Sequence, residues 1–361
     1  MISYASASSS FQNAMTLPTD IQVEAPDRNR LLLIPKLVLL GAAVFAAGEA
    51  SWRFTGFQPA PSDLLAFGRF YRAARDSSNA VALIGSSKVL CDLDPRTLKR
   101  ELPKWDFYQL AINGSSALPM LENLAQDTMF HGYVLCEFNT AHFMAEYPFR
   151  KDETDALSYV QFIQRRSYLD FLTAWFFETL SQRSALGAAK DWDFIGVFAG
   201  RLASIVRNRA ESNSALLTNV VRRDDRSWRV NRRGKDNSRL IARWAEMGRS
   251  KGKRANNLQR VASWVEAIRR RGGDVVFIRM PVSGSLKRIE DETYPDRDWF
   301  IQSLAGSGIN IIDSAKEPAL SGFDCPDESH LDADDVGRFS TALARILEDR
   351  QLLTRTPRTL R

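Results

Sequence analysis

From residue 80 onward, short apolar runs alternate with amphipathic segments. The apolar runs are AVALIG, FYQLAIN, GYVLCEFN, DVVFIRM and INIIDSA, and each predicts a short buried strand. The segments that follow them predict helices. Because strands joined by crossover helices form parallel sheets, the pattern predicts one α/β domain over residues 80–347, followed by a tail at 348–361. Its ligand site is expected beyond the carboxyl ends of the strands.

The N-terminal residues have a different pattern. Residues 1–30 lack a periodic apolar face, which predicts a disordered tail. Between Leu31 and Gly48 the only charge is Lys36, so residues 31–50 predict a transmembrane signal anchor. The basic residues on its N-terminal side predict that the tail is cytoplasmic and that the main domain is extracytoplasmic or periplasmic.

Two other interpretations of this segment stay open. Pro35 interrupts the apolar run, as expected if the segment were a buried core helix. Small residues near Ala46–Ala50 also fit the processing site of a cleaved signal peptide. The Pro-containing residues 51–79 predict a linker between this segment and the α/β domain.

The middle of the chain, at about 147–254, interrupts the strand–helix alternation. It contains aromatic stretches with helical spacing and a long basic run, so it predicts a helical insertion in the α/β domain. The insertion is expected either to cap the domain with solvated charges on its outer face, or to contact a membrane surface or a partner. Its pattern matches no nucleic-acid-binding motif.

The net charge and the cysteines limit the kinds of partner and metal site that the sequence indicates. The formal charge of +6 and the isoelectric point near 9.3 are compatible with anionic partners without selecting one. Cys91, Cys136 and Cys325 are isolated, so they indicate neither a zinc site nor a disulfide framework. No metal or organic cofactor is expected.

The chemistry-bearing residues follow the predicted strands. Gly85-Ser86-Ser87 ends the first strand, Asn113-Gly114-Ser115-Ser116 the second, and Asn139 follows the third. Asp327 and His330 lie in a loop before the last helix. A serine nucleophile needs an imidazole base, and the imidazole needs a carboxylate to orient it, so Ser87, His330 and Asp327 could form a catalytic triad.

This order of motifs resembles the SGNH, or GDSL-like, hydrolase superfamily, with Ser87 in the place of the family's nucleophile. Ser86 stands where the family has aspartate. Such Gly-Ser-Ser variants are typical of its membrane-anchored branch, which includes DltD and the alginate acetylation proteins AlgJ and AlgX. The resemblance implies a flavodoxin-like, three-layer α/β/α fold and covers residues 80–139 and 274–347.

The resemblance also implies an oxyanion hole formed by the backbone N–H groups of Ser87 and Gly114, with Asn139 as a further donor. The family's Gly-x-Asn-Asp sequence is absent around Asn139. Arg279, at the end of a later strand, could bind a substrate carboxylate or phosphate, or it could form an ordinary ion pair.

Each candidate has a structural alternative. The paired serines could cap the helices that follow them, and Asp327 could also be a helix cap. His330 could be a surface residue, and His142 is a competing base.

The function expected from the resemblance is that of a membrane-anchored serine esterase or O-acyltransferase that acts on a cell-envelope or exported polysaccharide. Its relatives imply a membrane-bound O-acyltransferase as partner. The alternative is a non-catalytic SGNH-fold protein that binds glycan or acts as a scaffold in polysaccharide export or modification. A soluble nucleic-acid-binding protein is the least favoured of the three.

Overall fold

The computed structural model describes residues 28–54, 63–144, 220–230 and 257–354, together with Tyr159, Phe176, Thr179 and Arg183. The chain divides into two compact units at residues 48 and 49. The sheet and the candidate site belong to the second unit.

A five-stranded sheet, all parallel, forms the centre of this unit. Its strands, in spatial order, are β2 (Asp106–Gln109), β1 (Ala80–Ile84), β3 (Tyr133–Glu137), β6 (Val275–Arg279) and β7 (Asn310–Asp313). This is the strand order of doubly wound, flavodoxin-like sheets. The predicted α/β class and the predicted strands are confirmed. The chain leaves β1 in one direction for β2 and returns on its other side for β3, so the end of β1 is the topological switch point.

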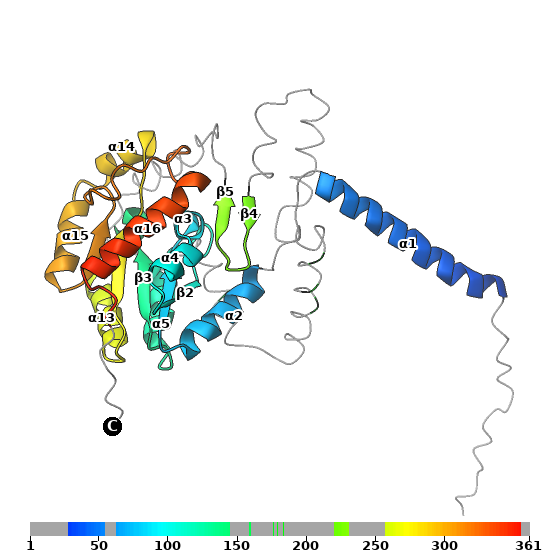
Figure 1. Ribbon diagram of the computed structural model, residues 1–361, viewed down its shortest axis with the longest axis horizontal. Coiled ribbons are helices and arrows are strands. Elements are labelled where there is room, and N and C mark those ends of the chain that lie inside the picture. The colour runs from blue at the N-terminus through cyan, green and yellow to red at the C-terminus, as the bar shows by residue number, and fades with distance from the viewer. Residues whose placement is uncertain are drawn as a thin grey trace, which may run out of the picture. The chain divides into compact units, whose positions relative to one another are not determined.

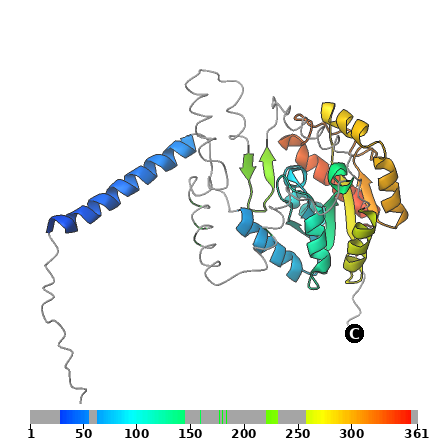
Figure 2. The same cartoon turned by 180° about the vertical axis from the view of Figure 1, so that it is seen from behind.

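Helices cover both faces of the sheet (Figures 1 and 2). One face packs against α2 (Asp63–Asp76), α5 (Leu118–Gln126), α13 (Leu258–Arg269) and α15 (Arg297–Gly306). The other packs against α3 (Ser87–Asp92), α4 (Pro95–Glu101) and α16 (Ala333–Asp349). Two further helices, α6 (Thr140–Met144) and α14 (Gly284–Thr293), follow β3 and β6.

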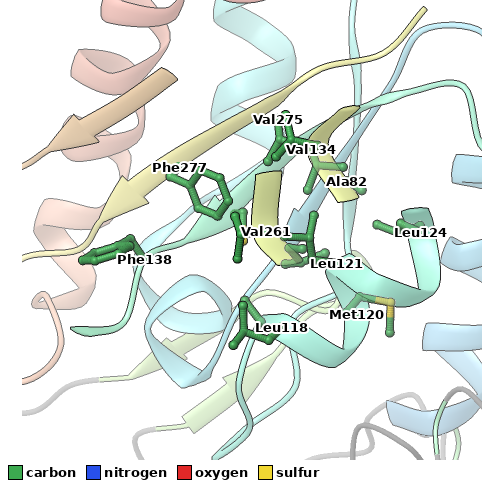
Figure 3. Packing of buried hydrophobic residues seen from close by; sticks show 14 of the residues in the cluster. Ala82, Leu118, Met120, Leu121, Leu124, Val134, Phe138, Val261, Val275 and Phe277 are labelled. Carbon is green, nitrogen blue, oxygen red and sulfur yellow. The ribbon is translucent and has the colours of Figure 1, made fainter. Parts of the chain in front are cut away.

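Apolar packing on the first face explains why these segments are amphipathic. Val261, Val265 and Ile268 are spaced to lie on one side of α13 and are at most 1% exposed. Figure 3 shows Val261 beside Leu121 of α5 and the strand residues of the same core. The strands β1, β3 and β6 are buried along their whole length, which is why they are continuous apolar runs in the sequence.

Helix α1 (Arg28–Phe54) contains residues 31–50, the predicted signal anchor. Within the described part of the chain, no helix has the length and apolar content needed to cross a membrane. Of the tail predicted for residues 1–30, residues 1–27 lie outside the described residues.

The predicted linker at residues 51–79 contains a structural element that the sequence analysis missed. Residues 63–76 form α2, which packs Phe67, Tyr71 and Ala74 onto the sheet. These apolar residues recur at helical spacing on one face. The Pro-containing stretch before them obscured a helix that belongs to the core.

The predicted helical insertion at 147–254 contains a β-hairpin. Strands β4 (Val220–Arg222) and β5 (Trp228–Val230) pair in antiparallel register, so a helix is wrong for residues 220–230. Asp225 Oδ1 accepts hydrogen bonds from the Ser227 N–H and hydroxyl at 3.0 and 2.6 Å, an Asx turn that reverses the chain. The isolated residues described between 159 and 183 are helical, and the rest of the insertion lies outside the described residues.

Arg226, in the hairpin turn, joins this hairpin to the domain. Its side chain is 1% exposed and its guanidinium forms an ion pair with Asp63 of α2 at 3.0 Å. It also donates to the carbonyl oxygens of Gln109, which ends β2, and of Ala111, and lies 5.0 Å from the ring centre of Phe67. A buried charge is stable only when it is paired and hydrogen-bonded, as it is here.

A substitution at Gly273 tests how closely the chain packs at the start of β3 and β6. A Cβ at this position would overlap the carbonyl oxygen of Gly132, which is backbone and cannot rotate away. We expect Gly273→Ala to lower the free energy of unfolding by about 1–3 kcal/mol, as overpacked core substitutions do. The measurement is the denaturant dependence of the far-UV circular dichroism of the full chain.

The matched control is Gly337→Ala, within α16, where an added Cβ meets no atom within 4 Å. Alanine is the better helix former, so this variant should gain about 0.5–1 kcal/mol. Equal effects in the two variants would contradict the packing described for Gly273.

Candidate active site

The turn after β1 is shaped by a close approach to β3. A Cβ on Gly85 would lie 2.7 Å from both Cβ and Oε2 of Glu137 and 2.6 Å from Val89, so only glycine fits. The absent side chain lets the Ser86 N–H donate to Glu137 Oε2 at 2.5 Å. The Ser86 hydroxyl accepts the Lys88 N–H at 3.3 Å as the N-cap of α3. Ser87 therefore begins the helix with its own hydroxyl not used in capping.

Ser87, His330 and Asp327 form a continuous hydrogen-bonded chain. Ser87 Oγ lies 2.9 Å from His330 Nε2, and His330 Nδ1 lies 3.1 Å from Asp327 Oδ2. The other carboxylate oxygen of Asp327 accepts the backbone N–H groups of His330 and Ser329 at 2.7 and 3.0 Å. Asp327 thus orients both the ring and the backbone of His330. This geometry allows the imidazole to accept the Ser87 proton while the carboxylate stabilises the resulting positive charge.

Helix α3 fixes both sides of this contact. Ser87 is its first residue, and Asp92, fully buried, is its last. Asp92 Oδ1 accepts the backbone N–H of Leu331, the residue after His330, at 3.1 Å. A helix of about one and a half turns therefore links Ser87 to the loop that carries His330.

Glu328 attaches the same loop to α14. It has φ 67°, a left-handed backbone that non-glycine residues rarely adopt. Its Oε2 accepts the Ser285 hydroxyl at 2.6 Å and the Leu286 N–H at 3.0 Å, in the first turn of α14. Gly284 makes room for this carboxylate, since a Cβ there would lie 2.5 Å from Glu328 Oε1. The strained residue between Asp327 and His330 is thus held by its own side chain.

The second predicted oxyanion donor lies in a turn beside the nucleophile. The Ile112 N–H donates to the Gly85 carbonyl oxygen at 2.9 Å, which carries the chain after β2 alongside the end of β1. Gly114 follows in this turn with φ 70° and is exposed. As the first residue of α3, Ser87 has a backbone N–H without an acceptor inside the helix. Gly114 thus lies in the turn that runs alongside Gly85, two residues before Ser87, and its N–H as an oxyanion donor stays a prediction.

Asn139 lies after β3, on the other side of Ser87, and is 8% exposed. Its Oδ1 accepts the His142 N–H at 3.3 Å, which makes it the cap of α6. Any contribution to an oxyanion hole would have to come from its amide nitrogen.

The hydrogen bonds of the site distinguish between the alternative roles of its serines, histidines and cysteine. Ser116 Oγ accepts the Leu118 N–H at 3.2 Å, the capping role left open for it. The imidazole that contacts Ser87 belongs to His330 and not to His142. Cys325 precedes the loop that carries Asp327 and His330, but burial and then the charge of Asp92 raise the pKa of its thiol, so it is not a thiolate nucleophile.

Arg279 ends β6 as predicted, but its guanidinium pairs with two carboxylates. It donates to Asp313 at 3.1 Å and to Glu290 at 3.0 Å, and all three side chains are at most 6% exposed. Burial alone would raise the pKa of Glu290, but the charges of Arg279 and Lys88 lower it, so the pair is ionised. These contacts favour the ion-pair interpretation of Arg279 over substrate binding.

Sequence reasoning missed three residues that shape the site, Asp92, Glu137 and Glu328. A carboxylate at the end of an otherwise apolar strand was the only available signal for Glu137. Nothing in the sequence indicates positive φ at Glu328, because glycine and asparagine are the residues that favour it.

Comparison with protein-family models and with curated proteins finds no match for this chain. The site is therefore interpreted from its own geometry.

The role of Arg279 can be tested by Arg279→Met. Removing the guanidinium leaves Glu290 and Asp313 buried without their partner, so we expect the free energy of unfolding to fall by about 3–5 kcal/mol. Arg338→Met is the control, because its pair with Asp335 is on the surface and should change stability by no more than about 1 kcal/mol. Unchanged stability in Arg279→Met would contradict the ion-pair interpretation.

The hydrogen bonds of Glu328 predict that its contribution to folding stability depends on pH. The hydrogen bond from Ser285, and then that from Leu286, lower the pKa of Glu328 below its ordinary value of 4.5. Its contribution is therefore present above pH 4.5 and is lost as the pH falls through the lower, folded-state pKa. We expect wild type to exceed Glu328→Ala in thermal midpoint at pH 7, and the difference to shrink below about pH 4.5.

The control is Glu292→Ala, on the same helix α14, for which the difference from wild type should not change in this way. A Glu328→Ala difference that is constant from neutral to acidic pH would show that the carboxylate does not hold the loop.

Proposed function

We propose that the protein is an SGNH-like serine acyl-transfer enzyme, an esterase or an O-acyltransferase. The observation that carries the proposal is the chain of contacts from Ser87 Oγ through His330 to the carboxylate of Asp327, which is buried. Such a chain is the arrangement that activates a serine hydroxyl at neutral pH. A serine that only capped a helix, or a histidine that was only a surface residue, would not need this chain of hydrogen bonds.

In the proposed reaction, Ser87 Oγ attacks an acyl carbonyl and transfers its proton to His330 Nε2. Asp327 keeps Nδ1 protonated and stabilises the imidazolium. The N–H groups of Ser87 and Gly114 would stabilise the oxyanion as it develops. His330 then gives the proton to the leaving alcohol, and an ester on Ser87 remains. Water or a hydroxyl acceptor attacks this ester by the same steps in reverse.

The topology supports the SGNH assignment. Ser87 follows the strand at the switch point of a flavodoxin-like sheet, where such sheets bind ligands. The loop with Asp327 and His330 precedes the last helix, α16, which is the order expected from the resemblance. The chain departs from the family at Ser86, whose hydroxyl caps α3, and at Asn139, whose oxygen caps α6.

We further propose that α1 anchors the enzyme in the inner (cytoplasmic) membrane, with the α/β domain outside it. The support is the row of large apolar side chains Leu37, Val38, Leu39, Leu40, Val44 and Phe45, which are 50–69% exposed. Contiguous exposed apolar surface on this scale is typical of a lipid or protein contact. This location favours a cell-envelope or exported polysaccharide as acceptor, with a membrane-bound O-acyltransferase as the source of the acyl group.

The proposed activity is tested with p-nitrophenyl acetate and the purified full chain. We expect Ser87→Ala and His330→Ala to lower kcat by about a thousandfold or more, as loss of a triad member does. Ser86→Ala is the matched control, because its hydroxyl caps the helix and does not contact His330. It should retain most of the activity and lose about 1 kcal/mol of stability.

Wild-type activity that persists in Ser87→Ala would show that Ser87 is not the nucleophile. A folded wild type that neither hydrolyses the ester nor reacts with a fluorophosphonate at Ser87 would favour the alternative, a non-catalytic glycan-binding or scaffold protein.

A further inference from the structure

A strongly basic groove lies between the hairpin and two helices of the α/β domain. It has a volume of about 820 Å³ and is bounded by α4, α16 and the β4–β5 hairpin. Its lining is Asp94, Thr97, Arg100, Arg223, Arg229, Ala333, Asp334, Gly337, Arg338, Thr341, Ala342 and Arg345. We call this set the arginine groove. Arginines outnumber aspartates in it by five to two, which is unusual for a solvated surface of mixed charge.

At the hairpin end of the groove, two arginines share one carboxylate. Arg223 and Arg229 donate to the two oxygens of Asp94 at 3.1 and 2.7 Å. Asp94 is 5% exposed, and its Oδ2 also accepts the hydroxyl of Thr97. Burial, together with the charge of Arg223, lowers the pKa of Arg229, although the charges of Asp94 and Asp225 oppose the effect. Because two guanidiniums share the one carboxylate of Asp94, a further anion at this end of the groove would be attracted to both.

The other three arginines lie farther along the helices and have weak partners. Arg100 donates to Glu101, its neighbour in sequence, at 3.0 Å, and Arg345 acts electrostatically on the same carboxylate. Arg338 pairs with Asp335 at 2.7 Å, with 75% of its side chain exposed. Surface pairs of this kind contribute little, so a multivalent anion can compete for these guanidiniums.

The shape of the groove favours an extended ligand. Arg338 and Arg345 are separated by two turns of α16, a rise of about 10 Å along the helix axis. Between them the lining residues are small or polar, and a Cβ on Gly337 would meet nothing within 4 Å. A single small anion could not contact both ends.

The groove also reaches the first residue of α16, three positions after His330. Arg229 Nη1 donates to the carbonyl oxygen of Ala333 at 3.4 Å. Ala333 begins α16 directly after the segment that carries His330. A chain bound in the groove would therefore extend toward the residues that hold the imidazole.

We propose that the arginine groove binds a linear acidic glycan, through its carboxylates, and so guides the acceptor polymer to Ser87. The anionic chemistry follows from the groove itself, whereas the choice of a glycan rests on the proposed function. The hairpin, whose two lining arginines come from the insertion, then acts as a substrate-binding element.

The test is titration calorimetry of the full chain with a defined oligogalacturonate, and with a neutral maltooligosaccharide of equal length. We expect binding of the acidic oligomer, weakened by salt, and little binding of the neutral one. The double variant Arg338→Gln/Arg345→Gln should lose about tenfold or more in affinity, which corresponds to about 1.4 kcal/mol or more. Arg260→Gln/Arg270→Gln is the control, because these exposed arginines lie in α13 and at its C-cap, on the opposite face of the sheet.

Equal binding by wild type and the groove variant, or equal binding of the neutral oligomer, would overturn the proposal. Tighter binding of a DNA duplex than of the oligogalacturonate would overturn the choice of glycan. Ser87→Ala should bind the oligomer as wild type does. If Ser87→Ala binds the oligomer and wild type has no esterase activity, the proposed reaction is wrong, but the arginine groove is still a glycan-binding site.

Discussion

The close approach of β1 and β3 at their carboxyl ends is the constraint on which the candidate site depends. Gly85 has no space for a side chain against Glu137, and the Ser86 N–H donates to the Glu137 carboxylate instead. That contact directs the chain away from the sheet, so that Ser86 caps α3 and Ser87 begins it. A side chain at position 85 would separate the strands or displace the turn, and the nucleophile would move with it.

The base comes from the other end of the domain and must be held with equal precision. His330 is 243 positions after Ser87, and three independent contacts fix its loop. Asp327 accepts two backbone N–H groups of the loop, Asp92 accepts the Leu331 N–H, and Glu328 accepts from the first turn of α14. The loop is thus held within itself by Asp327 and from outside by α3 and α14, so the imidazole is oriented by the fold alone. Preorganisation of this kind is what makes general-base catalysis efficient.

Much of the fold and the three residues of the Ser87–His330–Asp327 chain could be predicted from the sequence. Strands buried on both faces appear as apolar runs, and the order of the serine turn and the Asp-x-x-His loop places them at the same edge. The choice of Ser87 over Ser86 came from the family resemblance, since both hydroxyls suit a helix cap. The sequence could not show that Arg279 has two buried carboxylates as partners, because Glu290 and Asp313 approach it only in the folded chain. The hairpin was missed because its strands are short and rich in arginine.

The central claim is that Ser87 is a nucleophile activated by His330 and Asp327. Its most direct test is the rate constant for phosphonylation by a fluorophosphonate as a function of pH, with the modified residue identified by peptide mass spectrometry. We expect modification of Ser87 at a rate that falls on acidification, because a protonated imidazole cannot accept the Ser87 proton. We also expect Asp327→Asn to slow this reaction by about a thousandfold or more. Modification at another residue, or a rate independent of both pH and Asp327, would contradict the central claim.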